Sequence, residues 1–334
     1  MRVLAAVDKF RGTLTARQAA RAVGDACFEA GHDAVEVPLA DGGEGTLEAL
    51  GGGNRVSDVT GPLGDPVRAA WQLRRDTAVI EMAAASGLAL AGGPTHNDAL
   101  AATTTGTGEL IDAALDAGAR RIVVGLGGSA TTDGGLGAVS AIHAPARLKR
   151  VEFLIACDVD TAFVDAARVF GPQKGASPAQ VTLLTRRLEQ LVQRYRAQYG
   201  IDVSNLPGAG AAGGLAGGLA ALGGRLVPGF ELVADVVELA DHIAGSDLVI
   251  TGEGLLDDQS FHGKVVGGVV AMARRAGVRV AVVCGSVDDD IDRTQLEGLE
   301  VVSLVERFGE ERSWNEPHGC VEAATRHLLG LLSR

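Results

Sequence analysis

Short apolar runs alternate with amphipathic stretches at both ends of this chain of 334 residues. Continuous apolar runs of four to seven residues predict buried strands, and apolar positions that recur with a 3.6-residue period predict helices. Strands that alternate with helices in this way favour a parallel sheet covered by helices on both faces. The predicted strands are 3–7, 35–39, 248–250, 278–284 and 300–304, and the predicted helices are 15–30 and 316–332.

The pattern differs in the middle of the chain. Short strand-like runs at 56–60, 67–73 and 77–82 are separated by turn residues, a spacing typical of hairpins. Further along, the apolar period predicts a long amphipathic helix at 178–199, with Ser177 as its cap. We therefore expect one α/β domain made of N- and C-terminal parts, with a smaller β-rich domain inserted. The predicted bounds are 1–58, 98–142 and 240–334 for the first domain, and 59–97 and 143–239 for the insert.

Three glycine-rich segments follow apolar runs, and each contains carboxylates. They are residues 40–45 (ADGGEG), 127–135 (GGSATTDGG) and 251–258 (TGEGLLDD). A strand, a glycine turn and a helix place backbone N–H groups where an anion binds, and ligands bind at that edge of an open α/β sheet. Carboxylates there suit a divalent cation or a proton acceptor beside a phosphate. The segments together therefore indicate phosphoryl transfer.

Composition narrows the function further. The chain has 47 glycines, about twice the usual share of roughly 7%, and a formal charge of −12. No basic stretch resembles a nucleic-acid footprint, so we expect no nucleic-acid partner. No run of about 18 apolar residues predicts a membrane span. The four cysteines lack paired spacing, so reduced thiols in a cytoplasmic protein are the simplest interpretation.

Two familiar nucleotide motifs are excluded by their context. The letters GAGAAG at 208–213 fit a dinucleotide fingerprint, but a proline and polar residues precede them where a buried strand is needed. The letters HGK at 262–264 lack the first glycine and the final serine or threonine of a P-loop. Lys264 remains either a phosphate contact or a solvated lysine at a helix start.

Acidic residues at strand ends are the sharper candidates. Asp8 and Lys9 follow the first predicted strand, where active sites of parallel sheets are built, although a surface ion pair has the same appearance. Asp41 and Asp133 occupy similar places in their glycine loops and are alternatively simple helix caps. Asp158 and Asp160 lie on one face of a strand end and are candidates to contact metal or substrate.

The order of these motifs resembles the bacterial glycerate kinase type I family from residue 1 to about 290. The motifs that carry the resemblance are 8–15 (DKFRGTLT), 38–46 (PLADGGEGT), 59–64 (VTGPLG), 81–88 (EMAAASGL), 103–111 (TTTGTGELI), 127–135 (GGSATTDGG), 156–160 (ACDVD), 170–176 (FGPQKGA), 206–210 (LPGAG) and 251–254 (TGEG).

The resemblance implies ATP-dependent, Mg²⁺-assisted phosphorylation of D-glycerate, usually to 2-phosphoglycerate. It also implies a flavodoxin-like, doubly wound domain with an inserted RIFT-like domain, in a monomer or homodimer. Two segments depart from the family by being short, namely 138–150 and the stretch between 160 and 170. Leu255 also replaces a basic residue that the family often has.

Roles follow from residue chemistry and loop position. Lys9 and Arg11 are expected to bind anions, with Asp8 beside them, and Asp41 or Asp133 to accept the substrate proton while the other helps to hold Mg²⁺. The remaining candidates are Ser86, Thr103, Thr104, Thr105 and Thr107 for glycerate; Gly127, Gly128, Ser129, Lys174, Lys264 and Asp257 for ATP; and Asp158, with Asp133, for the metal.

Two other functions stay open at this point. The short segments in the expected insert are compatible with a non-catalytic homologue that binds glycerate or a nucleotide. A kinase of another small hydroxy acid would have the same motifs. Measuring ADP release with different acceptors distinguishes these two functions from a glycerate kinase.

Overall fold

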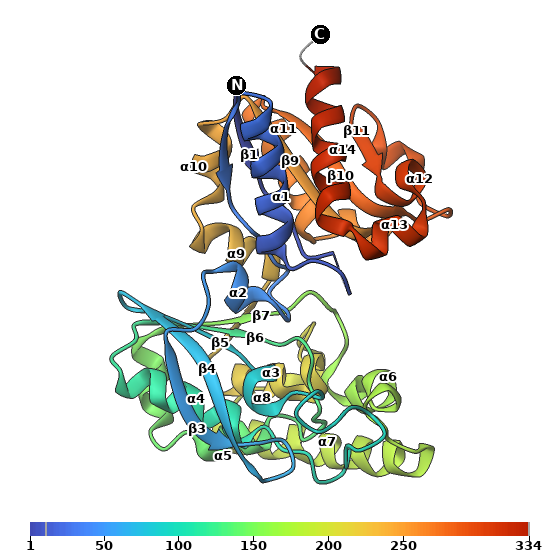
Figure 1. Ribbon diagram of the computed structural model, residues 1–334. Helices are drawn as coiled ribbons and strands as arrows, with labels where there is room; N and C mark the ends of the chain where they lie inside the picture. Colours follow the sequence, from blue (N-terminus) through green and yellow to red (C-terminus); the bar gives the residue numbers. More distant parts are fainter. Residues whose placement is uncertain (11, 333–334) are drawn as a thin grey trace. The chain divides into compact units, whose positions relative to one another are not determined.

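The computed structural model describes residues 1–10 and 12–332, which form two compact units (Figure 1). Unit 1 contains residues 1–41, 48–50 and 229–334, and unit 2 contains residues 42–47 and 51–228. The short helix α2 (Thr46–Ala49) contains one of the boundaries between them. Among the described residues, no helix has the length and apolar character that crossing a membrane requires.

Unit 1 is built on a five-stranded, all-parallel sheet with the order β11-β10-β9-β1-β2. Numbered within the unit, this is the order 2-1-3-4-5 of doubly wound, flavodoxin-like sheets. Its strands are β1 (Arg2–Ala5), β2 (Asp33–Glu36), β9 (Leu248–Leu256), β10 (Arg279–Val287) and β11 (Glu300–Ser303). Its helices are α1 (Ala16–Glu29), α9 (Gly229–Val236), α10 (Leu239–Ala244), α11 (Val265–Ala276), α12 (Leu304–Phe308), α13 (Glu310–Asn315) and α14 (Pro317–Leu332).

Both faces of this sheet are buried, as alternate residues of β10 show. Ala281 and Val283 belong to the apolar cluster that includes residues of α1 and α14. Val282 and Cys284 belong to a second cluster, which includes Val266 of α11. The continuous apolar run of the sequence is therefore explained by helices on both sides, as predicted for a parallel sheet.

Unit 2 contains a mixed, six-stranded sheet with the order β3-β4-β5-β6-β7-β8. The first three strands pair antiparallel and the remaining pairs are parallel. The strands are β3 (Arg55–Thr60), β4 (Pro66–Arg74), β5 (Thr77–Glu81), β6 (Arg121–Gly125), β7 (Glu152–Ala156) and β8 (Arg225–Val227). The helices are α3 (Ala83–Ser86), α4 (Thr105–Asp116), α5 (Leu136–Ala141), α6 (Ala166–Phe170), α7 (Pro178–Tyr199) and α8 (Leu215–Ala221).

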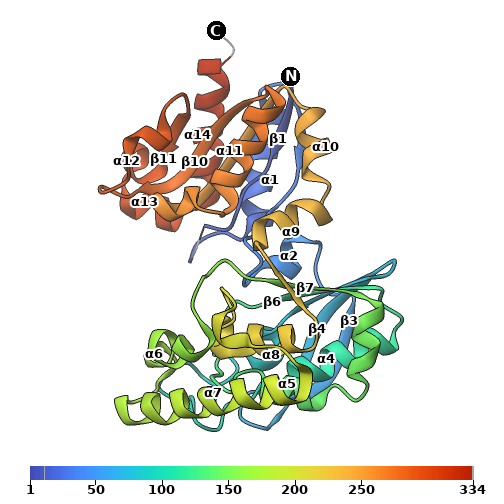
Figure 2. The same cartoon turned by 180° about the vertical axis from the view of Figure 1, so that it is seen from behind.

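Helices α4, α5, α7 and α8 cover one face of the sheet in unit 2 (Figures 1 and 2). Helix α7 has the bounds that the sequence predicts. Its N-terminal N–H groups are satisfied by a capping box of Ser177 and Gln180, and Gly200 ends it in the left-handed conformation. The buried hydroxyl of Tyr195 on this helix donates to the carbonyl of Gly134 at 2.9 Å. Helix α7 is thus tied to the glycine loop that follows β6.

The observed division differs from the predicted domain bounds in three places. Unit 2 begins before residue 59, since it includes residues 42–47 and 51–58. Residues 98–142 also lie in unit 2, because β6 pairs between β5 and β7. Residues 229–239 lie in unit 1, where α9 begins. Unit 2 is also the longer unit, whereas the prediction made the insert the smaller domain. Helical period alone does not tell which sheet a crossover helix covers, and this is why the segment 98–142 was assigned to the wrong side.

Candidate active site

Three strand ends of unit 1 bring carboxylates together at one edge of the sheet. The N–H of Asp8 donates to the carbonyl of Gly252 at 2.9 Å, which continues the pairing of β1 with β9. On the other side, the N–H of Leu39 donates to the carbonyl of Val7 at 2.9 Å, and Asp41 follows two residues later. The gap between β1 and β9 is the topological switch point, where open α/β sheets bind ligands.

Asp8 is buried, with 8% of its surface exposed. Burial raises the pKa of its carboxyl to about 6, and the nearby charge of Asp41 adds to this rise. The ammonium groups of Lys9 and Lys264 oppose it, as does the hydrogen bond from the Lys9 N–H to Asp8 Oδ1 at 2.7 Å. Asp8, Lys9, Asp41 and Lys264, which the sequence analysis selected separately, therefore form one electrostatic group in unit 1.

Glu253 on β9 belongs to the same group, although the sequence analysis did not select it. Burial raises the pKa of Glu253 to about 7; a hydrogen bond with Ser260 lowers it, and the charge of Asp8 raises it further. Its Oε1 atom is buried and has no hydrogen-bond partner among the described residues. The signal was present in the sequence, because Glu253 lies in the glycine-rich segment 251–258.

The segment 251–258 was expected to be a loop after a short strand, and this expectation was wrong. Strand β9 continues to Leu256. It can do so because Gly252 lies against the carbonyl of Val283 on β10, where a Cβ atom would collide with backbone. Asp257 follows the strand and accepts hydrogen bonds from the N–H and hydroxyl of Ser260, at 2.9 and 3.1 Å. The longer strand places Glu253 opposite Asp8.

The carboxylates of unit 1 are ligands of the kind that a hard divalent cation prefers, although the ligand atoms of Asp8, Asp41 and Glu253 do not all lie within 4.8 Å of one another. Mg²⁺ prefers carboxylate oxygens and is held in kinases by one or two of them together with phosphates. The buried Glu253 Oε1 without a hydrogen-bond partner among the described side chains, together with Asp8 and Asp41, supplies such oxygens. Burial, and then the charge of a neighbouring carboxylate, raises the pKa of Glu253 and of Asp8, and a bound cation would oppose both effects.

Asp133 in unit 2 has a different environment. Its Oδ2 accepts hydrogen bonds from the N–H and hydroxyl of Thr104, at 2.9 and 2.8 Å, and from the N–H of Gly137 at 3.1 Å. Its Oδ1 accepts from the N–H of Gly135 at 3.0 Å. The carboxylate therefore ties the glycine loop after β6 to the starts of α4 and α5. The Thr104 hydroxyl accepts in turn from the N–H of Ala138 at 3.0 Å.

Lys174 lies beneath the same loop. Its side chain is buried, and its Nζ donates to the carbonyl of Thr131 at 2.7 Å. Burial lowers the pKa of Lys174 to about 7, and the negative charge of Asp133 partly opposes this shift. The structure thus places Lys174 as a support for the loop backbone in unit 2.

The other predicted residues of unit 2 mainly contact one another. The buried hydroxyls of Ser86 and Thr107 lie 2.9 Å apart, and those of Thr103 and Thr105 lie 2.7 Å apart. In the glycine loop after β6, Gly128 has a positive φ, and its carbonyl accepts from the N–H of Leu88 at 2.8 Å. The next residue, Ser129, forms a β-bridge with Gly87. Gly127 packs closely on the backbone of Gly43 and Glu44.

One predicted residue is located elsewhere, since Asp158 follows β7 and is exposed. Arg11 lies outside the described residues, so its predicted role stays a prediction. One group of a histidine and two carboxylates, Asp25, His318 and Glu322, has ligand atoms within 4.8 Å of one another in the described part of the chain. It bridges α1 and α14, and Asp25 and Glu322 are each within ion-pair distance of an arginine.

A parallel sheet with acids and lysines at its switch point defines a candidate site for phosphoryl transfer. Comparison with known proteins agrees. Residues 3–145 and 139–333 match the glycerate kinase family. Glycerate 2-kinase of Escherichia coli K12 is 41% identical over 345 residues, which cover 91% of this chain and 90% of the relative. Glycerate kinase of Bacillus subtilis is 38% identical over 342 residues, which cover 90% and 89%.

A solved structure gives the same result. The crystal structure described as glycerate kinase 2 from Salmonella typhimurium LT2 superimposes with a TM-score of 0.85 at 34% identity, and covers 100% of this chain and 98% of its own. The chain therefore belongs to the glycerate kinase family and is an enzyme of the kinase class. The resemblance inferred from the sequence motifs is confirmed.

Proposed function

We propose that this protein transfers the γ-phosphoryl group of ATP to a hydroxyl of D-glycerate, with 2-phosphoglycerate as the product. Family membership and the activity named for the E. coli relative, glycerate 2-kinase, support the substrate and the position. The observation that carries the proposal is the group of Asp8, Asp41, Glu253 and Lys264 at the switch point of unit 1.

The proposed roles follow the chemistry of phosphoryl transfer, which depends on positioning and charge neutralisation. Asp8 and Glu253 would hold Mg²⁺, which would neutralise charge on the phosphates when bound. Lys9 and Lys264 offset negative charge on the transferring group or on the glycerate carboxylate. Arg11, which lies outside the described residues, keeps its predicted role of binding an anion.

Asp41 is the preferred proton acceptor of the two that the sequence left open. As the glycerate oxygen attacks the γ-phosphorus, the bond from that phosphorus to the bridging oxygen of ADP breaks, and the hydroxyl proton passes to the Asp41 carboxylate. Asp133 is disfavoured because four donors already point at its two oxygens. We assign Asp133 to the support of its loop.

The test is ADP release measured with ATP, Mg²⁺ and D-glycerate, with L-glycerate and no acceptor as controls. We expect turnover when D-glycerate is the acceptor and none with L-glycerate or without an acceptor. ³¹P NMR of the product should then show 2-phosphoglycerate. Turnover that is equal without acceptor, or that requires a different hydroxy acid, would contradict the proposed substrate. Binding of ATP without any turnover would indicate the non-catalytic homologue instead.

A further inference from the structure

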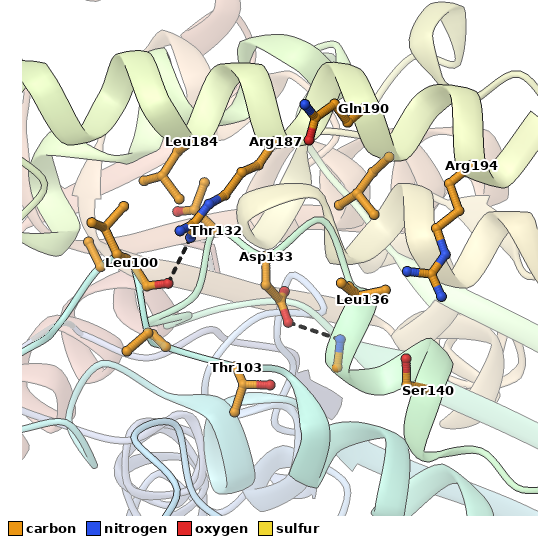
Figure 3. Close-up of a pocket in the computed structure, with 15 residues that line it drawn as sticks. Leu100, Thr103, Thr132, Asp133, Leu136, Ser140, Leu184, Arg187, Gln190 and Arg194 are labelled. Atoms are coloured by element: carbon orange, nitrogen blue, oxygen red, sulfur yellow. Dashed lines mark hydrogen bonds between the residues drawn. The ribbon is translucent and has the colours of Figure 1, made fainter.

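A pocket within unit 2 is lined by Thr103 and Asp133, which the sequence analysis selected, but by none of the unit 1 residues proposed for phosphoryl transfer (Figure 3). Its volume is about 530 Å³, within the range of roughly 300–1,000 Å³ that small-ligand sites have. The walls come from the segment 99–103, from the end of the glycine loop and the start of α5, and from one face of α7.

Most of the wall is apolar. Ala99, Leu100, Ala102, Leu136, Leu184 and Leu191 supply aliphatic surface. D-Glycerate has an oxygen on each of its three carbons, so it has no apolar part that could pack against this aliphatic surface. The lining therefore suits a ligand with an apolar body.

Two arginines supply the charge of the pocket. Arg187 and Arg194 are seven residues apart, two turns on one face of α7, and both line the pocket. Arg187 is held by the carbonyl of Leu100, to which its guanidinium donates at 3.0 Å. The guanidinium of Arg194 extends toward Ser140 on the facing helix (Figure 3). Each guanidinium has five N–H donors and no acceptor, so this side of the pocket selects an anion.

The other polar groups agree with an anionic ligand. Asp133 is the one acidic side chain of the lining, and its two oxygens accept hydrogen bonds from Thr104, Gly135 and Gly137.

We propose that this pocket is a binding site for a small organic anion, a carboxylate or a phosphate monoester, whose body is apolar. The anionic group pairs with Arg194 and Arg187, and the body packs on the leucines of α7 and α5. The site lies within unit 2 and is separate from the proposed reaction.

The probes are 4-fluorobenzoate and 4-fluorophenyl phosphate, with binding followed by ¹⁹F NMR on the full chain without ATP. The neutral 4-fluorobenzyl alcohol has a similar body and serves as the charge control. We expect at least one anion to bind about tenfold or more tightly than the alcohol, because hydrogen bonds to charged groups are the strong ones. Unlabelled D-glycerate should not displace the bound probe.

Variants locate the site. Arg194→Met keeps the length of the stem and should weaken binding of the anion about tenfold or more. Arg186→Met is the matched control, since Arg186 is an exposed neighbour on α7 that does not line the pocket. Ser140→Phe, at an exposed lining position, should block binding by filling the space.

Four results would each overturn the proposal. These are equal binding of the alcohol, unchanged binding in Arg194→Met, displacement by D-glycerate at equal concentration, and the absence of binding up to about 10 mM, where a specific site would be filled. Since binding is read without ATP, none of these results depends on whether the chain phosphorylates glycerate.

Discussion

Asp8 and Asp133 occupy similar places in the sequence but opposite environments in the structure. Each follows a parallel strand, β1 for Asp8 and β6 for Asp133. Asp133 has four donors around its carboxylate. Asp8 has other carboxylates nearby, and burial raises its pKa to about 6. The comparison supports the proposed division of roles, in which hydrogen-bond satisfaction, more than position in a motif, separates a structural acid from a reactive one.

The largest expected effect is on turnover in Glu253→Gln. Loss of one cation-binding carboxylate should lower kcat by about 10²–10³-fold, the range for removal of one electrostatic contact to a transition state. The same change removes a buried charge, so the free energy of unfolding at pH 8 without Mg²⁺ should rise by about 1–3 kcal/mol. Steady-state kinetics and urea unfolding measure the two quantities. Asp241→Asn, at an exposed residue of α10, is the control.

A pair of variants tests the roles proposed for Asp133 and Asp41. In Asp133→Asn, the new amide N–H₂ group faces at least one N–H or O–H that now donates to Asp133, so the free energy of unfolding should fall by about 2 kcal/mol. Asp41→Asn should lower kcat by about 10²-fold or more. Thermal unfolding and kinetics are measured for both. If Asp133→Asn keeps full stability but loses turnover, the division of roles drawn here is wrong.

The effect of Mg²⁺ on stability should depend on pH. The pKa of Glu253 is about 7 in the folded chain against an ordinary value of 4.5, so the native state binds the extra proton between these values. Stability without metal therefore falls as pH rises through this window. Mg²⁺ binds the ionised carboxylates, so it should raise Tm more at pH 8 than at pH 5.5. An equal increase at both values would place the cation elsewhere.

The smallest expected effect concerns Lys174. Burial lowers its pKa to about 7 from 10.5, so the unfolded chain binds more protons between these values and stability rises with pH through that window. Lys174→Met removes this dependence and loses one hydrogen bond to the Thr131 carbonyl. We expect a flatter stability curve between pH 7 and 10, measured by urea unfolding. An unchanged slope would show that Lys174 is not the titrating group.

The sequence predicted local structure better than it predicted which segments, distant in the sequence, contact one another. The capping box and closing glycine of α7 are local signals, and its bounds were predicted correctly. The pairing of β6 between β5 and β7 depends on contacts distant in the sequence, so residues 98–142 were assigned to the wrong unit. The same limit applies to the site. Glu253 becomes notable only once β9 is seen to continue past Gly252 and to lie beside Asp8.

The position of β1 in the middle of its sheet has a consequence for the synthesis of the protein. Strand β1 is flanked by β2, which follows it closely, and by β9, which begins at Leu248. On the ribosome, unit 2 is therefore complete in sequence before most of unit 1 exists, and the first two strands wait for the C-terminal third of the chain. The edge of β1 and the carboxylate of Asp8 meet their partners last, so the candidate active site is among the final features to form.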